Sequence, residues 1–337
     1  MSASNQLKEF IVDYLRIQSF RTPDLNRLKD LCKDTAPKHI IRIIRGCTRH
    51  NIRYELKDTP ESLREDWKDE NRTCLHMAAE DEDFEMISIL FDKLSDEDQL
   101  RLLRINTDKA GSVSWLSMRY GGFTWAMELA KSATHEALKT EIYGEVLVYT
   151  CQNDDAQALQ LLLGAVTSDT LMSLLSTLTM GAEYHSCIQE AAYRGINTFI
   201  SMLSQHLPSD SVLSLLLEQC EGDGGRTALH IACDRKKLKV IETVIGLVPI
   251  ENRLRLIIAA DDDGNTVLHA AVASGDKSCV LALKIDQLTR EQQYAVMVKE
   301  NKDGLKAIDV AKEQKNKQLE GFFDNRLQQS SIRKCDE

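Results

Sequence analysis

The chain has few residues that break regular structure, since only 5 prolines and 16 glycines occur in 337 residues. This scarcity argues against a low-complexity or collagen-like chain. No apolar run approaches the roughly 18 residues of a membrane-spanning helix, and residues 1–6 lack the basic-then-apolar order of a signal peptide. With 43% hydrophobic and 28% charged residues, the sequence predicts a chain that is folded along most of its length.

The nine cysteines include no Cys-x-x-Cys pair, and their number is odd. We therefore interpret them as small apolar core residues and not as metal ligands or disulfide partners. Unpaired cysteines are typical of proteins in a reducing compartment. We expect a cytoplasmic protein, and a nuclear location remains open.

Motifs that carry catalysis or hold cofactors are also missing. The sequence has no Gly-x-x-x-x-Gly-Lys-Ser/Thr phosphate loop and no cysteine and histidine cluster with zinc-ligand spacing. The segment 261–264, Asp-Asp-Asp-Gly, resembles half a calcium loop, but Ala270 stands where such a loop has its glutamate. We therefore expect no enzyme activity, no cofactor and no metal site.

The net charge of −10 is unevenly distributed along the chain. Residues 1–57 hold 12 basic and 6 acidic side chains, a balance of +6, so the remaining residues carry −16. A strongly acidic body disfavours nonspecific binding to nucleic acid. The basic part includes a stripe at helical spacing, which is either a solvated face or a contact for an anionic partner or membrane. The stripe consists of Arg42, Arg45, Arg49 and Arg53.

One pattern recurs along the chain: a glycine or asparagine, then threonine, leucine, histidine and small residues. Its clearest copies occupy 71–79, 225–233 and 264–271. This order resembles the signature of the ankyrin-repeat family, in which glycine closes a turn, threonine caps a helix, leucine enters the core and histidine ties neighbouring loops together. The family's proline is replaced in these copies by Cys74, Ala228 and Val267.

The threonine position of the pattern returns at a nearly fixed interval. Weaker copies extend the series, with spacings of 40, 32, 41, 41, 39 and 40 residues. The aligned positions are Thr73, Val113, Glu145, Ser186, Thr227, Thr266 and Lys306. Gly122 falls where the family has a glycine between its two helices.

Most copies contain a further stretch that opens with capping and acidic residues and then becomes apolar, which predicts a third helix. This helix accounts for a repeat of about 40 residues where the family usually has about 33. These stretches begin at Ser95, Ser168, Ser209, Ile250 and Thr289. Near Thr134 to Tyr143 the third helix runs into the next unit, so we expect that junction to lack a hairpin loop.

These patterns predict an all-α-dominated fold, an ankyrin-like α-solenoid with short hairpin loops between its helical units. We expect a capping helix in residues 1–21, about seven or eight units over residues 22–327 and a polar tail over residues 328–337. The repeats are weakest at 22–68 and 105–180. We expect a structural, hydrogen-bonding role for the signature histidines His76, His230 and His269.

In the resembled family, partners usually contact the hairpin tips and the exposed positions of the first helices, which line a concave groove. Several copies have tyrosine at these positions, and tyrosine supplies contact area at low entropic cost. The alternative is that the residues at these positions only pack between neighbouring repeats. The expected partner-binding residues are Tyr120, Tyr149, Gln152, Tyr193, Arg194, Asp234 and Arg235.

The resemblance implies a noncatalytic adaptor or scaffold that binds a protein partner. The alternative is a regulatory subunit or a host-directed effector that modulates a partner enzyme after docking. The turns between helices differ in charge, acidic at 80–83 and basic at 235–239. This polarity either orients a partner or belongs to solvated turns of random sign.

Overall fold

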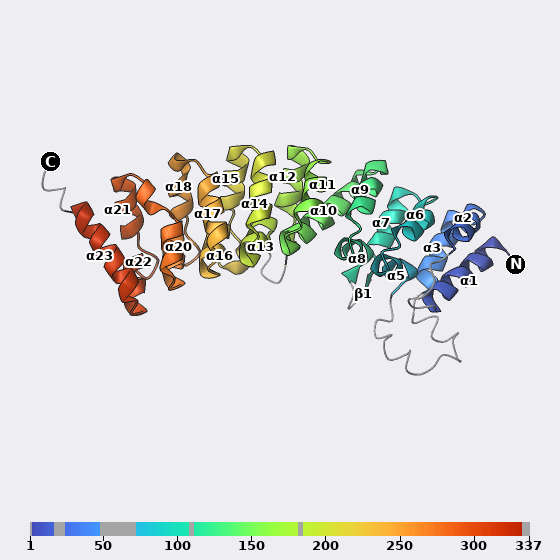
Figure 1. The fold of residues 1–337 in the computed structure, drawn as a ribbon, viewed down its shortest axis with the longest axis horizontal. Coiled ribbons are helices and arrows are strands. Elements are labelled where there is room, and N and C mark those ends of the chain that lie inside the picture. The colour runs from blue at the N-terminus through green and yellow to red at the C-terminus, as the bar shows by residue number, and fades with distance from the viewer. Residues whose placement is uncertain (1, 17–23, 48–71, 108–110, 181–184, 332–337) are drawn as a thin grey trace, which may run out of the picture. The chain divides into compact units, whose positions relative to one another are not determined.

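The computed structural model describes residues 2–16, 24–47, 72–107, 111–180 and 185–331. The chain divides into two compact units, unit 1 (Met1–Tyr149) and unit 2 (Thr150–Glu337). Both units are built from helices, and the strands among the described residues form only two-residue antiparallel hairpins (Figure 1). The expected fold class, an all-α, solenoid-like stack of helical units, is confirmed.

Unit 1 begins with three helices that pack on one another and continues with two repeats. The first three helices are α1 (Ala3–Arg16), α2 (Leu25–Lys33) and α3 (Pro37–Gly46). The first repeat contains α5 (Cys74–Glu80), α6 (Phe84–Phe91) and α7 (Asp96–Leu103). The hairpin of β1 (Asn106–Thr107) and β2 (Gly111–Ser112) leads into α8 (Val113–Arg119) and α9 (Phe123–Ser132).

Unit 2 repeats the same order of elements. Its first helices are α13 (Cys187–Arg194), α16 (Ala228–Asp234), α19 (Val267–Ala273) and α22 (Ala307–Glu313). Its second helices are α11 (Ala156–Leu163), α14 (Asn197–His206), α17 (Leu238–Leu247), α20 (Lys277–Ala282) and α23 (Lys317–Ser331). Its third helices are α12 (Ser168–Thr177), α15 (Ser209–Leu217), α18 (Ile250–Ile257) and α21 (Arg290–Val298).

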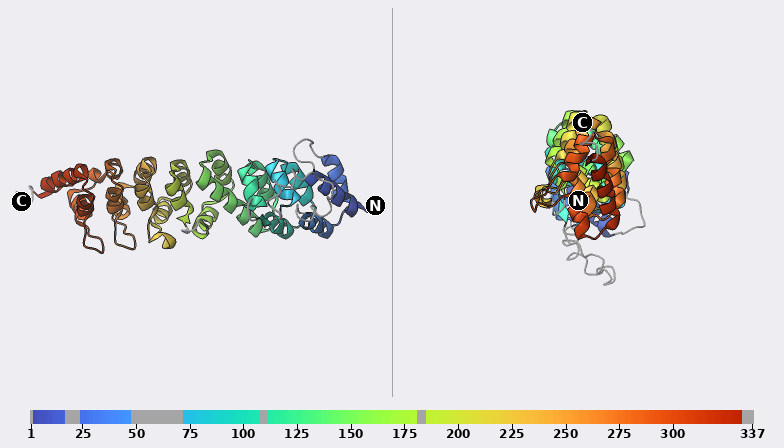
Figure 2. Two further views of the ribbon diagram at one scale, coloured as in Figure 1. Left: turned by 90° about the horizontal axis from the view of Figure 1, so that it is seen from below. Right: turned by 90° about the vertical axis from the view of Figure 1, so that its left-hand side faces the viewer.

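Helices of the same kind pack in rows within unit 2. The first helices contact one another in the order α13, α16, α19 and α22, and the second helices in the order α11, α14, α17 and α20. The views in Figures 1 and 2 both show these helices following one another in chain order. Hairpins join successive repeats, through β3 (Thr179–Met180) with β4 (His185–Ser186) and through isolated bridges at 220–226, 260–266 and 300–306.

The first helices begin where the sequence supplies a cap and end where the backbone turns left-handed. Thr227 adopts an extended conformation (φ −84°, ψ 167°) before α16, and Leu229 and Ala232 are fully buried against the neighbouring repeats. After each first helix comes a residue with positive φ, which closes the turn to the second helix. These residues are Glu82, Gly121, Asp154, Gly195, Lys236, Gly275 and Lys315.

This left-handed position corrects the alignment of the second repeat. Ser112 and not Val113 caps α8, because the Ser112 hydroxyl accepts a hydrogen bond from the Trp115 amide at 3.1 Å. The left-handed glycine is accordingly Gly121 (φ +84°) and not Gly122. Gly122 leaves space for a neighbouring side chain, since a Cβ there would lie 2.6 Å from the Phe84 ring.

The missing hairpin loop is confirmed by α10 (Glu136–Asn153), one continuous helix that begins in unit 1. Glu145, aligned above with the capping residues, therefore lies inside a helix and caps none. At the C-terminus, α23 continues past Leu327 to Ser331, into the segment where the polar tail was expected. The expected boundary at residues 21 and 22 lies outside the described residues.

The basic stripe is not one continuous helical face. Its first two members, Arg42 and Arg45, are exposed on α3. That helix ends at Gly46, followed by Cys47 as its cap residue. Arg49 and Arg53 lie outside the described residues, so an anionic contact through the whole stripe stays a prediction.

Candidate functional site

The exposed end of α13 and the end of α16 bring several of the expected partner-binding residues together in unit 2. The Arg235 guanidinium lies over the Tyr193 ring, 4.4 Å from its centroid, a cation–π contact that fixes both side chains. Arg194 reaches back to the backbone oxygen of Gln152, 3.5 Å away. Tyr193 is half-buried, whereas the side chains of Arg194 and Arg235 are each 44% exposed.

Beneath these residues lies a buried polar centre, His185. Its Nδ1 is 3.4 Å from a carboxylate oxygen of Glu190, and its Nε2 is 3.4 Å from one of Asp223. The imidazole is 4% exposed, and its ring lies 5.7 Å from that of Tyr193. Burying these groups is possible because each has a polar partner.

Ion pairs extend this centre to the surface. Glu190 also pairs with Arg194, and Asp223 pairs with Arg226. Arg226 approaches Asp234 at 3.6 Å, and Asp234 approaches Arg235 at the same distance. The contacts of His185, Asp223, Arg226, Asp234, Arg235 and Tyr193 thus form a closed ring, to which Glu190 and Arg194 are attached through His185. We call this set of residues the Tyr193 network. Its members are His185, Glu190, Tyr193, Arg194, Asp223, Arg226, Asp234 and Arg235.

The remaining expected residues belong to unit 1. Tyr149 is half-buried, and its ring lies 5.1 Å from the Phe123 ring. Tyr120 is half-buried at the end of α8, where the Arg119 guanidinium lies 6.0 Å from its ring centroid. Unit 2 therefore contains five of the expected site residues: Gln152, Tyr193, Arg194, Asp234 and Arg235.

The sequence analysis did not place His185, Glu190 and Asp223 together. A local signal was available for two of them: His185 directly precedes the capping Ser186, and Glu190 is the fourth residue of the helix that follows. The residue before a cap and the fourth residue of the helix often contact one another, and when both are apolar this contact is called a hydrophobic staple. Asp223 comes from the next hairpin, and no spacing rule connects it to His185.

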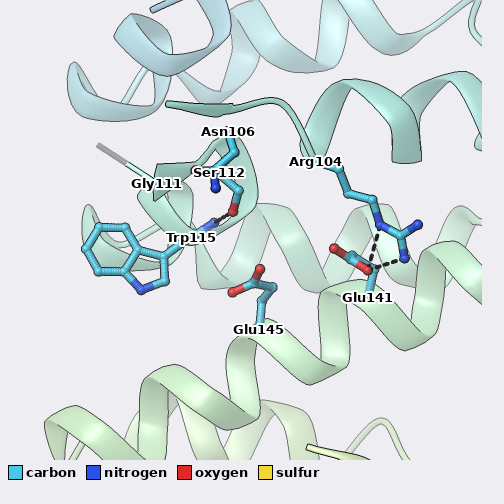
Figure 3. Close-up of a pocket in the computed structure, with 7 residues that line it drawn as sticks. All are labelled: Arg104, Asn106, Gly111, Ser112, Trp115, Glu141 and Glu145. Carbon is cyan, nitrogen blue, oxygen red and sulfur yellow. Dashed lines mark hydrogen bonds and ion pairs between the residues drawn. The ribbon is translucent and has the colours of Figure 1, made fainter. Parts of the chain in front are cut away.

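Unit 1 has a cavity of about 680 Å³ between the β1–β2 hairpin and α10 (Figure 3). On one side Arg104 donates two hydrogen bonds to a single oxygen of Glu141, at 2.6 and 3.0 Å. Glu145 projects between this pair and Trp115, and accepts a hydrogen bond from the Ser114 hydroxyl at 3.2 Å. Burial is the main cause that raises the pKa of the Glu145 carboxyl.

Burial makes several of the thiols unsuited to nucleophilic chemistry. The eight cysteines of the described residues are buried and form no disulfide bonds, as expected for core residues. Burial raises the pKa of the Cys32 thiol to about 11 and raises those of Cys74 and Cys233 further. A thiol that stays protonated is neither a nucleophile nor a metal ligand. Cys335 lies outside the described residues.

Within the part of the chain that the structure describes, no three histidine, cysteine or acidic side chains are grouped so that they could hold a metal ion. None of the helices described is both long enough and apolar enough to span a bilayer.

Repeated first and second helices, stacked with hairpins between them, define a class of helical repeat protein. Residues 202–293 match the family model for ankyrin repeats, in three copies. The matched stretch includes the Thr227 and Thr266 copies of the signature and part of the Tyr193 network. A search of curated proteins found no match.

Proposed function

We propose that this chain is a noncatalytic protein-binding module, an adaptor or scaffold, and that the Tyr193 network is its contact site. Ankyrin repeats are generally protein–protein interaction modules, and the match over residues 202–293 supports that class of function. We further infer that the repeat is a variant of about 40 residues with a third helix. The third helices α12, α15, α18 and α21 support this inference.

The observation that carries the proposal is the Arg235–Tyr193 contact at 4.4 Å. Tyrosine and arginine are enriched among the residues that dominate binding energy. Here Tyr193 packs against the buried His185 ring, and Arg235 is held by Tyr193 and Asp234. Both side chains remain partly exposed, so little side-chain entropy is lost when a partner binds. The Asp234 side chain, 50% exposed, supplies an acceptor beside them.

We propose a cytoplasmic location, because cysteines that are buried without disulfide bonds are typical of a reducing compartment.

Quantitative affinity capture tests the proposed site. The test variant combines Tyr193→Ala with Arg235→Ala, and the control combines Tyr294→Ala with Arg290→Ala on the third helix α21, where Tyr294 is 47% exposed. Circular dichroism first establishes that both variants are folded. We expect the test variant to lose a defined set of partners that the control retains. Equal recovery by the wild type and the test variant would refute the site.

A further inference from the structure

Unit 2 has a second surface feature, a row of basic side chains at the turns between first and second helices. We call it the basic strip. The turn after α16 contributes Arg235, Lys236 and Lys237, the turn after α19 contributes Lys277, and the turn after α22 contributes Lys315 and Lys317. We propose that the basic strip binds an acidic, extended segment of a protein partner; this rests on the proposed protein-binding function.

Printed contacts place these turns side by side. A Cβ on Gly195 would lie 2.9 Å from Cδ of Lys237, so the turn after α13 touches the turn after α16. The Cys279 thiol, on α20, lies 3.9 Å from the Cys233 carbonyl at the end of α16. The Asn316 amide donates to the Gly275 carbonyl at 3.1 Å, which joins the turns after α19 and α22. The strip therefore continues across three repeats.

Its lysines are available to a ligand. Among the described residues, no carboxylate lies within ion-pair distance of Lys236, Lys237 or Lys315. Lys236 and Lys315 are exposed. Cations that carry no internal partner keep their full capacity to pair with an acidic ligand.

The backbone at two of these lysines supports a role beyond solvation. Lys236 (φ 55°) and Lys315 (φ 56°) occupy the left-handed position that Gly195 (φ 90°) and Gly275 (φ 73°) fill in the neighbouring repeats. An L-residue is strained there and glycine is not. Lysine thus occupies two positions where glycine would adopt the backbone conformation more easily, and strained backbone conformations cluster at functional sites.

The spacing of the strip fits an extended peptide. Packed helices lie about 8–10 Å apart, and a chain in the extended polyproline II conformation rises about 3.1 Å per residue with three residues per turn. One repeat therefore corresponds to roughly three peptide residues. Because every third side chain of such a peptide faces the same way, an acidic residue at every third position would meet successive turns of the strip.

The surroundings disfavour nucleic acid and flat anionic membranes. Acidic residues lie within the row, at Asp234, Asp276 and Glu313. The hairpin tips at the other ends of the first helices are acidic as well, including Asp261, Asp262 and Asp263. A first helix of seven residues is about 10 Å long, so a wide polyanion over the strip would also meet these carboxylates. A narrow peptide avoids them.

Fluorescence anisotropy with designed peptides tests the proposal on the full chain. One labelled peptide has aspartate at every third position, a second has asparagine instead, and a third has the same aspartates in one block. The protein variants are Lys236→Glu with Lys315→Glu, and a control with the same charge change, Arg290→Glu with Lys299→Glu. Glutamate is compatible with the left-handed position, because Glu82 occupies it in unit 1 (φ 58°).

We expect the spaced aspartate peptide to bind best, and the Lys236→Glu, Lys315→Glu variant to lose about tenfold in affinity while the control is unchanged. Equal binding of the asparagine peptide, or equal binding by both variants, would overturn the proposal. So would tighter binding of single-stranded DNA or of anionic vesicles. Failure of this test would leave the proposed function standing as long as partner capture depends on Tyr193 and Arg235. Partner capture that does not depend on these two residues would refute the proposed function separately.

Discussion

The Nε2 atom of His230 lies 3.0 Å from the carbonyl oxygen of Asn265 in the next hairpin. A carbonyl can only accept, so Nε2 carries the proton. Nδ1 then accepts from the Thr227 amide at 3.2 Å and lies 2.8 Å from its hydroxyl. The signature histidine is therefore a neutral, buried bridge between repeats. His76 and His269 make the same bridges to Ile105 and Leu305.

Gln189 shows that the bridge needs one acceptor and one donor, not an imidazole. Its side-chain oxygen accepts from the Ser186 amide at 2.9 Å, and its side-chain nitrogen donates to the Glu218 carbonyl at 3.0 Å. In the last repeat, Asp309 provides only the acceptor: its carboxylate accepts a hydrogen bond from the Lys306 amide at 3.1 Å.

We predict that His230→Gln costs less than about 1 kcal/mol of unfolding free energy, because the amide replaces both hydrogen bonds. His230→Ala should cost about 2–4 kcal/mol, since it leaves a cavity and unpaired buried groups. Urea unfolding followed by circular dichroism measures both. Equal losses in the two variants would contradict the bridging role.

Acid should destabilise the chain through these histidines. Burial lowers the pKa of His230 and His269 below their ordinary value. The unfolded chain then takes up protons first, so stability falls as the pH drops below about 6.5, by up to about 1.4 kcal/mol per pH unit for each histidine. Urea midpoints at pH 7.5 and 5.5 measure this loss. A variant with His230→Gln and His269→Gln should lose less, and an identical loss would exclude the histidines as its cause.

The left-handed turn position yields a pair of opposite predictions. Lys236→Gly should raise stability by up to about 1 kcal/mol, because glycine relieves the positive φ. Gly275→Ala should lower it by about 1 kcal/mol for conformational reasons alone, since a Cβ there meets nothing within 4 Å. Thermal unfolding compares the two variants. A stabilising Gly275→Ala would contradict the assignment of strain to this position.

Glu145→Gln should stabilise the chain at neutral pH. Because burial raises the pKa of this carboxyl, the folded state holds its proton more tightly than the unfolded state does. Its contribution to stability is therefore present in acid and is lost as the pH rises through the folded-state pKa. The variant's advantage, measured by urea unfolding, should be present at pH 7 and disappear at pH 4. An advantage that does not change with pH would point to altered packing instead.

The recurring signature was sufficient to predict the stack and its cap positions at Thr73, Thr227 and Thr266. It misplaced the second cap by one residue, because Val113 was aligned on spacing alone. A side-chain oxygen that accepts from the helix amides favours a residue as the cap, and Ser112 supplies one where Val113 does not. The lost hairpin before Glu145 was predictable because the helical pattern of the third helix runs into the next unit, and the lone Gly144 in it is tolerated inside a helix.

The partner-binding residues were predicted from fixed offsets after each cap. In the structure Tyr193 lies on α13, Asp234 is the last residue of α16, and Arg235 directly follows that helix. The buried part of the Tyr193 network was not predicted, because His185 and Asp223 meet only when two hairpins stack. Such contacts depend on how repeats pack and leave no periodic trace in the sequence.

Site-specific photo-crosslinking tests the proposed contact site most directly. A photoreactive amino acid replaces Asp234 in one variant and Ser214, exposed on the third helix α15, in the other. Irradiation in cells, followed by mass spectrometry, identifies covalent adducts. We predict adducts with a partner protein from position 234 and none from position 214. Adducts from position 214 alone would contradict a binding site at the Tyr193 network.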